Sequence, residues 1–171
     1  MTMASPGSSN HTSSDKAVKD RYSAAAQASE PALCCAVSYN PRYLKAIPDE
    51  IIAKDYGCGD PSPFVNPGET VLDLGSGGGK LCYIASQIVG KSGKVIGVDC
   101  NEDMLALARK YRDQVATNLG YANTEFRCGR IQDLKLNLEL LAERWNGRPL
   151  TDVTDWLALQ NLEEQLRHDH P

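Results

Sequence analysis

Short apolar runs and longer amphipathic segments alternate through the middle of the chain. Residues 70–74, 94–98 and 124–128 have the length and apolar content of β-strands and are bounded by turn-forming residues. Between them, residues 80–89 and 102–118 carry apolar side chains three and four positions apart, which predicts two helices. This alternation predicts an α/β fold with a parallel sheet whose helical crossovers are right-handed.

The flanking segments contain no convincing strand and predict helices. One helix is expected from residue 14 to about residue 30, and Pro48 opens another. Thr151 is the expected N-cap of a C-terminal helix, and the apolar stripe around Trp156 is expected to pack on another surface. The chain therefore divides into a disordered tail (1–15), a helical, cysteine-containing segment (16–66), a strand-and-helix half (67–138), and a helical insertion or C-terminal helices (139–171).

Composition is that of an ordinary soluble globular protein, with 42% apolar residues, 23% charged residues and a net charge of −4. No long basic run points to nucleic acid, and no stretch approaches the roughly 18 apolar residues of a membrane span. The first 15 residues are rich in Ser and Thr and lack the apolar core of a secretory signal. The six cysteines are therefore expected to be reduced thiols in a cytoplasm.

A glycine-rich turn, residues 75–79, joins the first strand to the first helix, where backbone N–H groups can approach a ligand closely. A phosphate-binding P-loop is excluded, because Leu74 stands where its first glycine is required. A dinucleotide fingerprint is weakened by Lys80, which stands where that motif has Gly or Ala. Asp73, two residues before the first glycine, suits the cationic amino group of a methionine moiety and would repel a pyrophosphate.

A second acid, Asp99, ends the second strand. Its two oxygens can accept hydrogen bonds from both hydroxyls of a ribose. Together with Asp73 and the glycine turn, Asp99 favours S-adenosylmethionine over NAD as the cofactor, and Met104 is expected to cover the adenine. The other residues of these segments that we expect to bind the cofactor are Gly75, Ser76, Gly77 and Cys100.

Three cysteines precede the glycine turn. Cys34 and Cys35 are adjacent, and Cys58 lies in a loop between two glycines. Thiolates suit soft, thiophilic centres. Methyl transfer to an acceptor with its own lone pair requires positioning of the two partners and no general base. The three cysteines are therefore candidates to hold a thiophilic acceptor.

The order of these motifs resembles the arsenite methyltransferases. The resemblance is carried by Cys34-Cys35, the sequence Tyr56-Gly57-Cys58-Gly59, and residues 71–90 and 93–99, and it runs from about residue 18 to residue 134. It implies a Rossmann-like class I methyltransferase fold, in which residues 67–138 form the half that binds S-adenosylmethionine. It also implies trivalent arsenic as a small-molecule acceptor.

The resemblance further implies roles for individual residues. Cys35 and Cys58 would be catalytic, with Cys34, Cys35 and Cys58 as thiol ligands of arsenite. Tyr56 would form a wall of the cofactor pocket, and Arg130 and Ile131 would lie beside the adenine.

This chain also departs from that family. Family members continue into a fourth strand that carries an arsenic-binding cysteine, with another cysteine later, and this chain has neither. We therefore expect a fold truncated after strand three, with strand order 3-2-1 and an exposed apolar edge on strand one. Such a chain would be marginally stable, self-associate, or require a complementing C-terminal half.

Three alternative functions remain open from the sequence. One is a methyltransferase of another small acceptor, and the second is an inactive, truncated cofactor-binding module. The third is an NAD-linked oxidoreductase, which Asp73 and Lys80 disfavour.

Overall fold

The computed structural model describes residues 11–28, 37–57 and 59–169. Three strands, β1 (Thr70–Leu74), β2 (Lys94–Asp99) and β3 (Thr124–Cys128), form one parallel sheet in the order β1-β2-β3. The predicted α/β class, strand positions and strand order are therefore confirmed.

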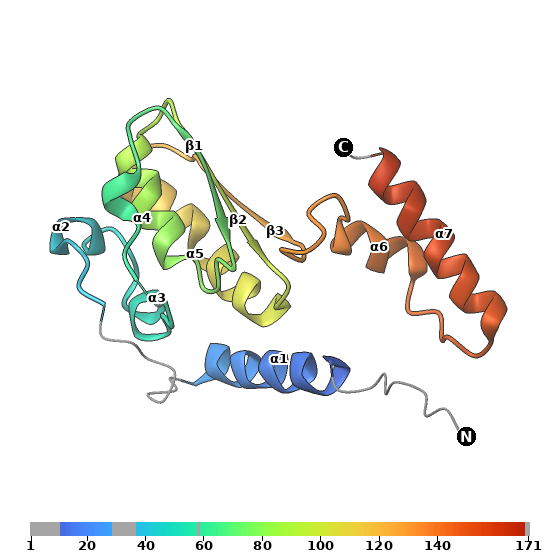
Figure 1. Ribbon diagram of the computed structural model, residues 1–171. Coiled ribbons are helices and arrows are strands. Elements are labelled where there is room, and N and C mark those ends of the chain that lie inside the picture. The colour runs from blue at the N-terminus through green and yellow to red at the C-terminus, as the bar shows by residue number, and fades with distance from the viewer. Residues whose placement is uncertain (1–10, 29–36, 58, 170–171) are drawn as a thin grey trace, which may run out of the picture.

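Two crossover helices, α4 (Lys80–Val89) and α5 (Glu102–Leu119), cover one face of this sheet (Figure 1). Each helix ends at a glycine with positive φ, Gly90 and Gly120, because these glycines adopt a backbone conformation that other residues reach only with strain. Both helices agree with their predicted bounds to within one residue.

The main core lies between these helices and the sheet. The side chains of Tyr83, Leu105 and Val95 are fully buried there. The Tyr83 ring meets Phe126 edge-on at 5.6 Å, and its hydroxyl donates to the carbonyl oxygen of Ala108 at 2.5 Å. Since each such buried side chain contributes about 1.5–3 kcal/mol, this layer fixes β2 and β3 relative to α4 and α5.

The opposite face of β1 is open. Side chains alternate along a strand, so Leu72 and Leu74 point away from α4, and they are 50% and 47% exposed. Among the described residues, β1 pairs only with β2. The expectation of an exposed apolar edge on the first strand is confirmed.

Short helices and a longer one precede the sheet. They are α1 (His11–Gln27), α2 (Pro41–Leu44), α3 (Asp49–Ala53) and the 3-10 turn η2 (Ser62–Phe64). Since α1 begins at His11, the predicted disordered tail of residues 1–15 is wrong for residues 11–15. Its polar composition misled the prediction, because Ser, Thr and Asp are also common at helix starts.

Two helices follow the sheet, α6 (Leu138–Trp145) and α7 (Val153–Asp169), and they extend beyond β3 (Figure 1). The predicted cap of α7 is off by one residue. Asp152 accepts the N–H of Asp155 at 2.9 Å, while Thr151 donates its own N–H to the Asp155 carboxylate at 3.0 Å. The packing predicted for the apolar stripe is found for only part of it, because Leu166 is fully buried while Trp156 is 50% exposed.

Candidate functional site

The glycine turn folds back over the end of β2. The N–H groups of Gly75 and Ser76 donate to the carbonyl oxygen of Val98 at 2.8 and 3.0 Å. Gly77 has a φ of +52°, and its N–H donates to Asp99 Oδ2 at 2.8 Å. The loop is thereby held with its backbone at the carboxyl ends of β1 and β2, where ligands bind in open α/β sheets.

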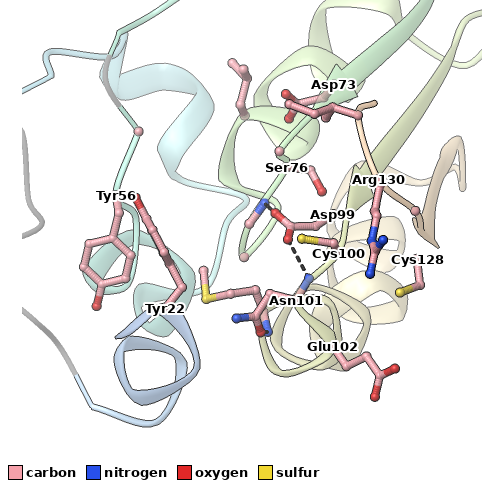
Figure 2. Close-up of a pocket in the computed structure, with 18 of the residues that line it drawn as sticks. Tyr22, Tyr56, Asp73, Ser76, Asp99, Cys100, Asn101, Glu102, Cys128 and Arg130 are labelled. Atoms are coloured by element: carbon pink, nitrogen blue, oxygen red, sulfur yellow. Dashed lines mark hydrogen bonds between the residues drawn. The ribbon is translucent and has the colours of Figure 1, made fainter. Parts of the chain in front are cut away.

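Asp99 is fixed from two sides. Its Oδ1 accepts the N–H of Asn101 at 2.8 Å, while Oδ2 accepts from Gly77 (Figure 2). A carboxylate has about four acceptor positions, so both oxygens keep capacity for ribose hydroxyls. The predicted ribose-binding acid therefore stands in a fixed orientation at the pocket.

Asp73 lies on the helix-covered side of β1, and its Oδ2 accepts a hydrogen bond from the Cys82 thiol at 3.2 Å. Burial raises the pKa of Asp73, and the negative charges of Asp99 and Asp55 raise it further. Burial also raises the pKa of Cys82 well above its usual range, so this thiol stays protonated and donates. Cys82 is thus more than the packing residue that its apolar helix face suggests.

One cavity of about 1560 Å³ brings these groups together. It is lined by the glycine turn, the ends of β2 and β3, α1 and the residues after α3 (Figure 2). Its lining includes every residue predicted to bind the cofactor: Tyr56, Asp73, Gly75, Ser76, Gly77, Asp99, Cys100, Met104, Arg130 and Ile131. Contact of these residues with a cofactor stays a prediction.

Ser76 offers a test of whether this cavity suits a bound ligand. Its hydroxyl is buried and has no hydrogen-bond partner among the described residues. A buried hydroxyl without a partner is unfavourable, and a polar ligand at the glycine turn would satisfy it. The Ser76 hydroxyl and the carboxylates of Asp73 and Asp99 fit a ligand with an amino group and a ribose.

Helix α1 forms one wall of the cavity. The rings of Tyr22 and Tyr56 meet edge-on at 6.2 Å, and the Tyr56 hydroxyl donates to the carbonyl oxygen of Ala25 at 3.1 Å. Asn101 donates to the carbonyl oxygen of Lys19 at 3.2 Å and caps α5 by accepting two of its first N–H groups. Sequence reasoning missed Asn101, although an Asn followed by two acids is a recognisable helix start.

A second group that sequence reasoning missed lies where α4 begins. Lys80 is buried, forms a salt bridge with Asp55, and places its ammonium 3.9 Å from the centroid of the Tyr39 ring. The sequence carried no signal for this cluster, because its members come from three separate segments.

The cysteines differ in chemical state. Cys100 is exposed and lines the cavity. Cys128 is buried, and burial together with Glu102 and Glu139 raises its pKa to about 11, so it does not supply a thiolate near neutral pH. Cys34, Cys35 and Cys58, predicted as catalytic residues and arsenite ligands, lie outside the described residues. Within the described residues, no three His, Cys, Asp or Glu side chains form a metal-type cluster.

No helix in the described part of the chain is both long and apolar enough to cross a membrane.

Part of this chain is similar to known methyltransferases. Residues 65–142 match a family model described as a methyltransferase domain. The chain is 45% identical over 111 residues to the arsenite methyltransferase of Aquipseudomonas alcaligenes, covering 63% of this chain and 32% of that protein. It is 51% identical over 80 residues to the arsenite methyltransferase of Halobacterium salinarum, covering 46% of this chain and 19% of that protein.

A solved structure is also similar. It is CrArsM, an arsenic (III) S-adenosylmethionine methyltransferase from Chlamydomonas reinhardtii, with a TM-score of 0.53 and 39% identity over 55% of this chain and 32% of that chain. This chain spans about a third or less of the length of these relatives. The fold is the Rossmann-like fold of S-adenosylmethionine-dependent methyltransferases, S-adenosylmethionine is the implied cofactor, and the matched part of the chain is similar to the arsenite methyltransferases.

Proposed function

We propose that this chain is the cofactor-binding part of an S-adenosylmethionine-dependent methyltransferase whose acceptor is trivalent arsenic. The observation that carries the cofactor half of the proposal is the meeting of Asp73, Asp99 and the glycine turn in one cavity. The similarity to arsenite methyltransferases supports the acceptor half.

When bound, S-adenosylmethionine supplies an electrophilic methyl group on a sulfonium. The residues of this chain position it. Asp73, oriented by the Cys82 thiol, would hold the amino group of the methionine moiety, and Asp99, held by Gly77 and Asn101, would accept hydrogen bonds from the ribose. Tyr56 and α1 form one side of the cavity.

Trivalent arsenic has its own lone pair, so the acceptor needs no general base. It is a thiophilic centre, so it needs thiolate ligands. Cys82 and Cys128 have raised pKa values and stay protonated. The resemblance to the arsenite methyltransferases implies Cys34, Cys35 and Cys58, which precede the glycine turn in sequence, as the thiolate ligands.

Isothermal titration of S-adenosylmethionine into the 171-residue chain tests the cofactor half. We expect micromolar binding, weakened roughly tenfold or more in Asp99→Ala, because a charge-assisted hydrogen bond is worth about 1.5–3 kcal/mol. Asp113→Asn, an exposed acid on α5 away from the cavity, is the matched control and should bind normally. Equal binding by Asp99→Ala and wild type would contradict the assignment of Asp99.

Equilibrium dialysis of arsenite, with arsenic quantified by mass spectrometry, tests the acceptor half. Cys58→Ser and the double variant Cys34→Ser/Cys35→Ser should lose binding, whereas Cys100→Ser should retain it, since Cys100 is exposed but outside the proposed ligand set. Cofactor binding without any cysteine-dependent arsenite binding would instead favour another small acceptor.

A further inference from the structure

The buried lysine at the start of α4 has no part in the cofactor recognition described above. Lys80 is 8% exposed, forms a salt bridge with Asp55 and lies over the Tyr39 ring. Burying an ammonium group is costly, and its partner and the aromatic face offset that cost. The ammonium group thereby lies in the wall of the cavity, beside the glycine turn.

The charges around this lysine are unequal. Asp55, Asp73 and Asp99 all line the cavity, and Asp55 and Asp99 are close enough to raise the pKa of Asp73. Of these three carboxylates, Asp55 alone has a cationic partner within the described residues. Five further cationic side chains line the cavity: Lys16, Lys19, Lys54, Arg130 and Arg167. Lys54 pairs with Glu50, and Arg167 pairs with Asp133 and Glu163. The lining holds seven acidic and six basic side chains in all, so it carries a small excess of negative charge.

Methyl transfer changes the charge of the ligand in this environment. The bond between the sulfonium sulfur and its methyl carbon breaks, its electron pair stays on sulfur, and the acceptor lone pair forms the new bond to carbon. The donor thereby loses one positive charge and leaves as a neutral thioether, S-adenosylhomocysteine. A negatively charged cavity binds the sulfonium more tightly than the thioether, and the size of that difference follows the net charge of the cavity.

We propose that Lys80 is a specificity-determining residue, which limits how strongly the cavity prefers the sulfonium donor over its thioether product by offsetting the charge of Asp55. Lys80 offsets the charge of Asp55 and so limits this preference, which would otherwise hold the donor too firmly relative to the product. The inference rests on the proposed function, because it takes S-adenosylmethionine as the ligand of the cavity.

The test is the ratio of two dissociation constants, that of S-adenosylhomocysteine divided by that of S-adenosylmethionine, measured by isothermal titration at one pH and one salt concentration. Lys80→Met leaves Asp55 negative and should raise the ratio roughly three- to tenfold, the range for one unit charge in a partly solvated site. Asp55→Asn leaves Lys80 positive and should lower the ratio by a similar factor. The double variant removes both charges and should return the ratio to within about twofold of wild type.

Lys91→Met is the matched control, because it makes the same charge change at an exposed lysine just after the other end of α4. Its ratio should equal that of wild type. If the pair only braces the fold, its variants weaken both ligands equally and the ratio stays constant, which overturns the inference alone. Failure of the wild-type chain to bind either ligand overturns the proposed function, and the inference with it. Asp55→Asn, which changes little in shape, keeps the test decisive if Lys80→Met does not fold.

Discussion

The two faces of the sheet differ in what covers them. On one face, Val95 and Gly97 are buried beneath α4 and α5, while on the other Leu72 and Leu74 are about half exposed. Parallel sheets are normally covered on both faces, which is why their strands read as continuous apolar runs. The apolar run of β1 therefore predicts that both faces of this strand are covered, and the described residues cover only the face towards α4.

Among substitutions on the two faces, the largest change in the free energy of unfolding is expected on the covered face, at Gly97. An added Cβ would lie 2.8 Å from Cys82 Sγ and 2.8 Å from the Phe126 ring, both fixed in the core. Gly97→Ala should therefore lower the free energy of unfolding by about 1–3 kcal/mol, as overpacking does elsewhere. This free energy is measured by urea denaturation monitored by circular dichroism. Gly59→Ala is the control, because an added Cβ there meets no atom within 4 Å. An unchanged midpoint for Gly97→Ala would mean that the covered face is loosely packed.

How far the sequence predicts this molecule follows the same division. The strands, both crossover helices and the positions of Asp73 and Asp99 follow from local periodicity and turn residues, which depend on neighbours in sequence. The thiol that orients Asp73 and the ion pair of Lys80 with Asp55 depend on segments brought together only by the fold. No local pattern reports such contacts, so they could not be predicted.

The predictions of the α7 N-cap residue and of packing at Trp156 were inaccurate for other reasons. Thr151 and Asp152 are both good N-cap residues, and only the geometry of the turn decides between them. An apolar stripe predicts that a surface will be covered, but it does not say which surface covers it. Trp156 is half exposed, as Leu72 is, although Leu166 on the same helix is fully buried.

A substitution at Asp73 should change the free energy of unfolding less than Gly97→Ala does. Asp73 is a carboxylate on the covered face, paired with Gly97 on the neighbouring strand. Its pKa is raised in the folded chain, so the folded state binds this proton more tightly than the unfolded state. That contribution to stability is complete below the unfolded pKa of about 3.9 and is lost as the pH rises through the raised folded value. Asp73→Asn should therefore stabilise the chain at neutral pH while weakening binding of S-adenosylmethionine.

Paired urea titrations check this prediction. The stability difference between Asp73→Asn and wild type should be present at pH 7 and shrink as the pH falls towards 4. Asp113→Asn, at an exposed acid, should show no such trend. If Asp73→Asn is less stable than wild type at pH 7, the carboxylate makes stabilising contacts that outweigh its burial.

The smallest effect on stability is expected on the open face. Leu72→Thr/Leu74→Thr removes two half-exposed apolar side chains while keeping residues that favour strands, so the free energy of unfolding should change by only about 0.5 kcal/mol. Self-association should change more, because an apolar edge strand with unpaired backbone groups is a template for pairing with another chain. Sedimentation velocity over a range of concentrations should show wild type forming larger species and the double variant remaining monomeric. Arg127→Thr, at an exposed position on β3, is the matched control and should associate as wild type does. A wild-type chain that stays monomeric at every concentration would show that the half-exposed leucines of β1 do not drive self-association.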